Sequence, residues 1–84
     1  MIMNERERIG RRIADLRKEK GLTQKELAEA AGLDRTNITK IEAGKYNISI
    51  DILSKVANVL ECHFDIVSVS EYDMLRSART IIEP

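Results

Sequence analysis

Residues 35–43 combine polar side chains in a pattern that could read the edges of nucleic-acid bases. At about 100° per residue along a helix, Ile38 and Ile41 face one way. The opposite face carries Arg35, Thr36, Thr39, Lys40 and Ala43. Arginine can bind guanine through two parallel hydrogen bonds, and threonine can contact base edges or the thymine methyl group. A merely solvated helix would favour stronger helix formers there, so we predict base contacts from Arg35, Thr36 and Lys40.

A second set of polar residues is suited to the phosphates that flank such a base-reading helix. Gln24 begins the preceding helix, where backbone N–H groups and the helix dipole favour an anion. Lys45, Tyr46 and Asn47 directly follow Gly44 and supply one cation and two neutral donors, although Asn47 could serve equally well as a turn residue. The predicted phosphate contacts are Gln24, Asn37, Thr39, Lys45, Tyr46 and Asn47.

Two short helices joined by a tight turn must position these side chains. Thr23 and Glu26 have the spacing of a capping box, which marks the start of the first of them. Gly32 is placed to end that helix, Asp34 to cap the next, and Gly44 to end it. This is the helix-turn-helix pattern, whose second helix enters the major groove of double-stranded DNA. We therefore predict a recognition helix at about residues 35–43.

Further helices should flank this motif and complete a small core. Asn4 and Glu7 resemble a capping box ahead of a helix that ends near Gly21, and Ser49 begins another helix. Apolar residues recur at helical spacing in both, at Ile9, Ile13 and Leu16 and at Leu53, Val56, Ala57 and Leu60. The sequence predicts an all-α, compact bundle of four to five helices, with residues 1–62 as the DNA-binding domain.

The C-terminal segment has a different composition. Residues 63–69 are rich in β-branched and aromatic side chains without a helical stripe, which favours a β-strand. A lone strand is not stable in water, so the predicted partner is the same strand of a second copy. We expect residues 63–84 to form a dimerisation extension, with a short helix from 71 to about 82 and Met74 and Leu75 near the interface. The predicted dimer contacts are Phe64, Ile66, Val67 and Val69.

Composition limits the remaining possibilities. The 84 residues suffice for one domain, and 43% apolar with 33% charged residues indicates a globular chain. The net charge is zero, but residues 1–45 hold eleven Lys and Arg against eight Asp and Glu, and residues 46–84 hold three against six. The halves therefore carry +3 and −3, which suits a basic DNA-binding face and a more acidic partner face. No apolar run spans a bilayer and no targeting segment is evident, so we expect a cytoplasmic protein.

No residue cluster points to catalysis or to a cofactor. Cys62 and His63 are adjacent, but one Cys and one His supply at most half of a tetrahedral metal site. The single cysteine cannot form a disulfide framework, and the single histidine has no convincing catalytic partners. We therefore predict no enzyme activity, no metal and no cofactor.

Residues 9–60 resemble the lambda-repressor-like, XRE-type helix-turn-helix domain. The motifs that carry the resemblance are residues 9–17 (IGRRIADLR), 21–28 (GLTQKELA), 38–44 (ITKIEAG) and 49–60. The resemblance implies sequence-specific DNA binding, usually as a dimer on a palindromic operator, with a phosphate contact by Gln24. It also implies base contacts by Arg35, Thr36 and Lys40, and an ion pair between Arg17 and Glu42. This chain departs from the family pattern at Ile48, where many members have proline, and after Leu60, where many have Gly and a fifth helix.

The resulting prediction is a transcriptional regulator, a repressor that binds a palindromic operator as a homodimer. One alternative is the antitoxin of a toxin–antitoxin pair that represses its own operon, in which the C-terminal segment would hold the toxin. The other is a protein-interaction module without DNA binding, which would show no salt-dependent affinity for DNA.

Overall fold

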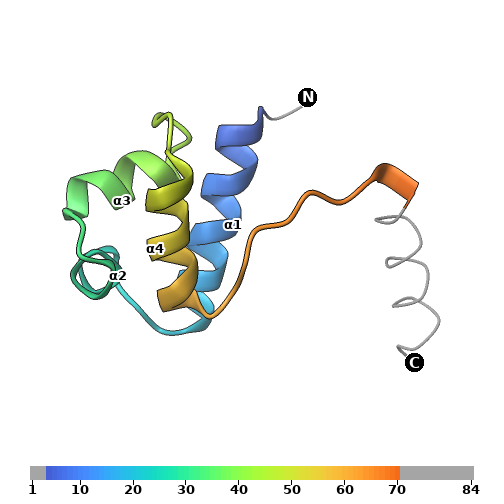
Figure 1. Ribbon diagram of the computed structural model, residues 1–84. Coiled ribbons are helices and arrows are strands. Elements are labelled where there is room, and N and C mark those ends of the chain that lie inside the picture. The colour runs from blue at the N-terminus through green and yellow to red at the C-terminus, as the bar shows by residue number, and fades with distance from the viewer. Residues whose placement is uncertain (1–3, 71–84) are drawn as a thin grey trace.

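The computed structural model describes residues 4–70, and within this range the chain forms four helices (Figure 1). They are α1 (Glu5–Glu19), α2 (Gln24–Ala31), α3 (Arg35–Glu42) and α4 (Ile50–Leu60). Helix α3 packs against both α1 and α2, and α4 packs against α2. None of the helices in the described range is both long and apolar enough to cross a membrane.

Hydrogen bonds at the helix starts explain why the elements begin where they do. Asn4 accepts from the Glu7 N–H at 2.9 Å, and Ser49 accepts from the Ile52 N–H at 3.2 Å. Thr23 and Glu26 form both bonds of a capping box, at 3.0 and 2.9 Å. These three predicted starts are confirmed. Asp34 occupies the N-cap position of α3 with an extended backbone, but its side chain makes no capping hydrogen bond within residues 4–70.

The predicted apolar faces converge on one core. Its fully buried members are contributed by all four helices, so each helix buries one face and exposes the other. They are Ile13, Leu27, Ala28, Ile38, Ile41, Val56 and Leu60. Ile9, Leu16 and Leu53 pack against this cluster while remaining half-buried. The inward positions predicted from helical spacing are thereby confirmed.

The predicted C-terminal β-strand is wrong. Residues 62–68 have no regular secondary structure, and no strand occurs anywhere in residues 4–70. A strand needs a neighbouring strand to pair its backbone N–H and C=O groups, and the described part of the chain offers none. Phe64, Ile66 and Val67 are consequently exposed on an irregular segment, and Val69 is exposed where the chain becomes helical at residues 69–70. The helix predicted for residues 71–82 and its Met74 and Leu75 lie outside the described residues.

Glu61 sets the direction in which the chain leaves the bundle. It caps the C-terminus of α4 in the left-handed conformation, with φ of 55°, which is unusual for a residue other than glycine. Its carboxylate lies 3.4 Å from the Lys20 ammonium group at the end of α1. From this point residues 61–70 pass α1 and run outward, away from α2 and α3 (Figure 1).

Candidate functional site

Helix α3 presents an exposed polar face that opposes its buried apolar face. Ile38 and Ile41 are 0% exposed, which fixes the rotation of the helix about its own axis. Arg35, Thr36 and Lys40 are exposed, as the sequence predicted for base-reading side chains. Thr36 and Lys40 are separated by four residues, so they project from nearly the same side of the helix. The structure thus brings the three residues onto one accessible surface.

An ion pair fixes the C-terminal end of α3 to α1. Arg17 of α1 donates to both carboxylate oxygens of Glu42, from Nε to Oε2 at 2.7 Å and from Nη2 to Oε1 at 3.0 Å. The same guanidinium donates to the Leu22 carbonyl at 2.7 Å, so it also holds the α1–α2 connection. Both side chains are about nine-tenths buried, and the hydrogen bond from Arg17 to Glu42 raises the pKa of Arg17. This bidentate geometry restricts the tilt of α3.

Gln24 links the start of α2 to α3 through both ends of its amide. Its Nε2 donates to Glu42 Oε1 at 3.1 Å, and its Oε1 accepts from Thr39 Oγ1 at 3.2 Å. Thr39 Oγ1 also lies 3.1 Å from the Arg35 carbonyl in the preceding turn. An amide nitrogen carries two hydrogens, so the bond to Glu42 leaves the other for an external acceptor. Gln24 is therefore held in place and still able to donate.

A small cationic hollow lies beside Gln24 at the start of α2. Its volume is about 450 Å³, and its lining residues are Arg17, Thr23, Gln24, Lys25 and Arg35. Backbone N–H groups of the first helical turn and the positive end of the helix dipole add to the potential there. Sequence reasoning missed Lys25, whose position beside Gln24 in the first turn of α2 was the available signal. The exposed cations Lys25 and Arg35 in this lining would favour an anion such as a phosphate group.

Two glycines allow α1 to approach the end of α3 at backbone distance. A Cβ atom on Gly10 would lie 2.1 Å from the Ile41 carbonyl oxygen, so a larger residue cannot occupy this position without movement. Gly44, which follows α3 with φ of +72°, would bring a Cβ to 2.8 Å from the Glu7 Cα. Because no side chain separates the two helices at these points, the α1 backbone directly supports α3.

The residues after α3 occupy three different environments. Lys45 is exposed, and its N–H donates to the Lys40 carbonyl at 3.0 Å to close the end of the helix. Tyr46 is half-buried and packs against the core, whereas Asn47 is exposed. Asn37, on α3 itself, is half-buried. Lys45 and Asn47 are thus accessible to an external phosphate, and Tyr46 anchors the segment between them.

The remaining predicted residues lie away from this surface. Figure 1 shows the segment that carries Phe64, Ile66, Val67 and Val69 on the side of the bundle away from α3. Cys62 is half-buried, and residues 4–70 contain no cluster of three or more His, Cys, Asp or Glu side chains placed to hold a metal ion. The site is therefore the α2–α3 surface alone.

The chain is similar in sequence to known helix-turn-helix proteins. The helix-turn-helix family pattern matches residues 13–67. The 10 kDa protein of the immF control region of Bacillus phage phi105 is 35% identical over 68 residues, which cover 81% of this chain and 76% of that protein. The immunity repressor of the same phage is 46% identical over 52 residues, covering 62% of this chain and 36% of the repressor.

A solved structure extends the similarity to three dimensions. The restriction-modification controller protein C.AhdI from Aeromonas hydrophila superposes with a TM-score of 0.66 at 37% identity, covering 68% of this chain and 86% of that one. The family pattern over residues 13–67 includes all of α2, α3 and α4, which together form the candidate site and most of the core. The chain belongs to the XRE-type helix-turn-helix family, whose members are DNA-binding transcriptional regulators rather than enzymes.

Proposed function

We propose that this chain is a repressor that binds a palindromic DNA operator as a homodimer and inserts α3 into the major groove of each half-site. The observation that carries the proposal is the Arg17–Glu42–Gln24–Thr39 network. It fixes α3 at both its C-terminal end and its α2-facing side, and leaves Arg35, Thr36 and Lys40 exposed. A rigidly held helix with a free polar face suits sequence reading, because geometric precision is required for base contacts.

The residues divide into two roles. Arg35, Thr36 and Lys40 would contact bases, and a good bidentate contact discriminates against a wrong base by about 1–3 kcal/mol. The phosphate contacts would come from Gln24, Lys25, Asn37, Lys45, Tyr46 and Asn47, while Thr39 would orient Gln24 through the hydrogen bond to its Oε1. Gln24 and Lys25 flank the cationic hollow at the start of α2, which supports a phosphate position there. Phosphate contacts fix the register of the protein on the duplex without selecting its sequence.

Repression and dimerisation rest on different observations. One relative is named an immunity repressor, which supports a role in blocking transcription, and another is a protein of the ImmF control region of the same phage. Dimerisation is supported by Phe64, Ile66, Val67 and Val69, which expose apolar surface on one segment of the described chain. Two copies would present two α3 helices to half-sites about one helical turn apart.

The test is selection of bound duplexes from a random DNA pool with the purified protein at moderate salt. Enrichment of an inverted repeat is expected, with half-site centres separated by about one turn of DNA. Absence of enrichment, together with no salt-dependent DNA affinity, would overturn the proposal and favour a protein-interaction module. An enriched single half-site without symmetry would overturn only the homodimer.

Substitution of Arg35 tests the assignment of roles. Arg35→Ala should weaken binding to the selected sequence by about 1–3 kcal/mol and relax the preference at one base position. Gln24→Ala should instead weaken binding to selected and random DNA alike, because a phosphate contact carries no sequence information. Lys55→Ala, which removes an exposed cation of α4, is the matched control. Equal losses on both DNAs for Arg35→Ala would contradict its base-reading role.

A further inference from the structure

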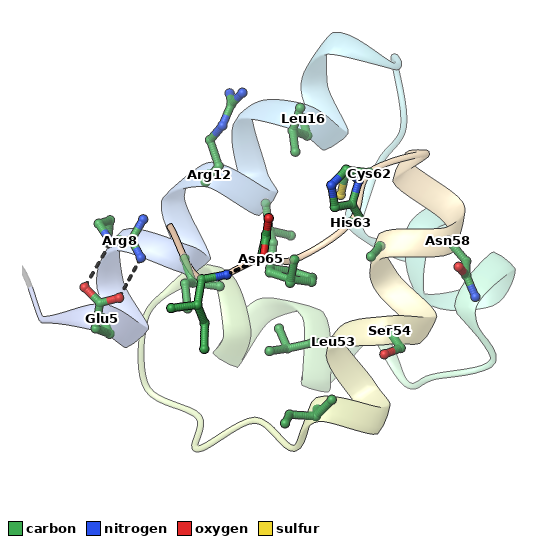
Figure 2. Close-up of a pocket in the computed structure, with 16 residues that line it drawn as sticks. Glu5, Arg8, Arg12, Leu16, Leu53, Ser54, Asn58, Cys62, His63 and Asp65 are labelled. Atoms are coloured by element: carbon green, nitrogen blue, oxygen red, sulfur yellow. Dashed lines mark hydrogen bonds and ion pairs between the residues drawn. The ribbon is translucent and has the colours of Figure 1, made fainter. Parts of the chain in front are cut away.

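A large groove lies between α1 and α4 and takes no part in the site described above. Its volume is about 1000 Å³, which equals the upper end of the range for ligand pockets. Figure 2 shows α1 on one side of it and α4 on the other, with His63 and Asp65 between them. The apolar lining from the two helices is Ile9, Ile13, Leu16, Ile50, Leu53 and Ala57. The groove is thus an apolar channel open to solvent.

The chain's own C-terminal segment crosses this groove without filling it. Residues 62–66 contribute to the lining, yet Phe64 is 45% exposed and Ile66 is 96% exposed. Val69 is 78% exposed beyond the groove. Figure 1 shows residues 66–70 running outward past α1, beyond the edge of their own bundle. The molecule therefore has both an unfilled apolar groove and an apolar segment that extends away from it.

We propose that the groove receives the C-terminal segment of a second copy, so that two copies exchange residues 66–69 reciprocally. Ile66, Val67 and Val69 of each copy pack between α1 and α4 of the other. This inference rests on the proposed homodimer and names the surface that receives its apolar contacts. The exchange is isologous, because both copies supply the same segment and the same groove, as two-fold symmetry requires.

The composition of residues 66–69 suits a second copy as the occupant. The groove lining contains Arg8 and Arg12 of α1 but also Glu5 and Asp65, so its formal charge sums to zero. Arg8 is paired with Glu5 at 2.6 Å, and Figure 2 shows Arg12 on the next turn of the same helix. Residues 66–69 (Ile-Val-Ser-Val) carry no charge and are exposed in their own copy. An uncharged, apolar segment can therefore enter the groove without leaving a buried ion unpaired.

The location of the groove is compatible with DNA binding by α3. In Figure 1 residues 61–70 leave the bundle on the α1 side, and α3 lies on the other side. Exchange at the groove therefore leaves Arg35, Thr36 and Lys40 accessible in both copies. It also buries the exposed apolar side chains and the apolar groove in a single step, which is the main driving force for association.

The experiment compares the dimer dissociation constant of groove and segment variants by analytical ultracentrifugation. Ser54→Trp fills the groove from an exposed position of α4, and Lys55→Trp places the same side chain on the same helix outside the groove lining. Ile66→Asp removes an apolar contact from the exchanged segment, and Ser70→Asp adds the same charge near its end. Asn58→Trp is a second groove-filling variant, and circular dichroism melting checks that each variant folds.

The exchange predicts that Ser54→Trp, Asn58→Trp and Ile66→Asp each weaken the dimer about tenfold or more, and that the two controls do not. Mixing Ser54→Trp with Ile66→Asp should form a heterodimer, because one copy keeps its segment and the other keeps its groove. If Ser54→Trp and Asn58→Trp both dimerise as tightly as the wild type, the exchange is overturned and the homodimer proposal stands. A wild-type chain that stays monomeric at all concentrations would overturn both proposals.

Discussion

Glu42 is the residue through which three helices are connected. It accepts hydrogen bonds from Arg17 of α1 and from Gln24 of α2, and it belongs to the last turn of α3 itself. A buried ion pair adds little net stability, because desolvation offsets most of the attraction between the charges. Its value here is geometric: the carboxylate fixes the position of Gln24 relative to α3. In the proposed complex, Arg17 and Glu42 would thereby control the orientation of α3 on DNA without touching the DNA.

Thr39 offers a test of this positioning at the residue scale. Thr39→Val removes the hydroxyl that donates to Gln24 Oε1, so it should weaken DNA binding by about 0.5–1.5 kcal/mol on all sequences. In a Gln24→Ala background the same change should have almost no effect, because the residue that Thr39 orients is gone. A double-mutant cycle measured by fluorescence anisotropy gives the coupling. Additive losses would show that Thr39 contacts phosphate directly.

The sequence predicted which residues share the exposed face of α3, but not the hydrogen bonds that connect Gln24 to this helix. Helical spacing was enough to place Arg35, Thr36 and Lys40 on one face, because Ile38 and Ile41 define the opposite face. The hydrogen bond between Gln24 and Thr39 joins residues fifteen positions apart on different helices. No local pattern encodes such a contact, since it depends on the angle at which α2 and α3 pack.

At the scale of elements, Gly10 determines how closely α1 and α3 pack. In an ordinary helix interior, Gly→Ala stabilises by about 1 kcal/mol. Gly10→Ala should instead lower the free energy of unfolding by about 1–3 kcal/mol, because its Cβ would lie 2.1 Å from the Ile41 carbonyl oxygen. Urea denaturation measures the change, and Arg11→Ala at the next, exposed position is the control. A stabilised Gly10→Ala variant would refute the close contact.

The capping box of α2 predicts a dependence of stability on pH. The Thr23 backbone N–H, followed by the Thr23 side chain, lowers the pKa of Glu26 below its ordinary value of 4.5. Since the folded-state pKa is the lower one, this contribution to stability is complete above 4.5 and is lost as the pH falls through the folded-state value. Glu26→Gln should therefore show a flatter decline of the urea midpoint in acid than the wild type.

Glu5 contributes to the same decline of stability in acid, so a Glu5→Gln variant can be compared with Glu26→Gln. The hydrogen bond from Arg8 lowers the pKa of Glu5, so its contribution is lost in the same direction. The Glu5→Gln/Glu26→Gln double variant should accordingly be flatter than either single variant. If Glu26→Gln follows the wild-type curve throughout the acid range, the capping bond to Thr23 does not form in solution.

Helix starts were predictable because their causes are local. Asn4, Thr23 and Ser49 each bond to a backbone N–H three residues ahead, so a window of four residues contains the whole signal. The strand prediction for residues 63–69 failed for the opposite reason. Branched and aromatic side chains favour a strand only where a neighbouring strand is present, and residues 4–70 contain none.

At the scale of the whole molecule, a net charge of zero does not exclude a local cationic surface. The cationic hollow of the α2–α3 surface lies in the half of the sequence that carries +3, and the C-terminal segment lies in the half that carries −3. In Figure 1 this segment leaves the bundle on the side away from α2 and α3. A small domain of zero net charge can therefore still attract a polyanion at one surface.

The backbone contact at Gly10 has a mechanical consequence. Where helices touch through long side chains, rotamer changes let one helix tilt against the other, but the Ile41 carbonyl meets α1 with no side chain between them. Helix α3 therefore has little freedom to tilt against α1. In the proposed complex the DNA, rather than the protein, would bend to accommodate a mismatch in curvature, so sites with flexible base steps would be favoured even at positions that no side chain touches.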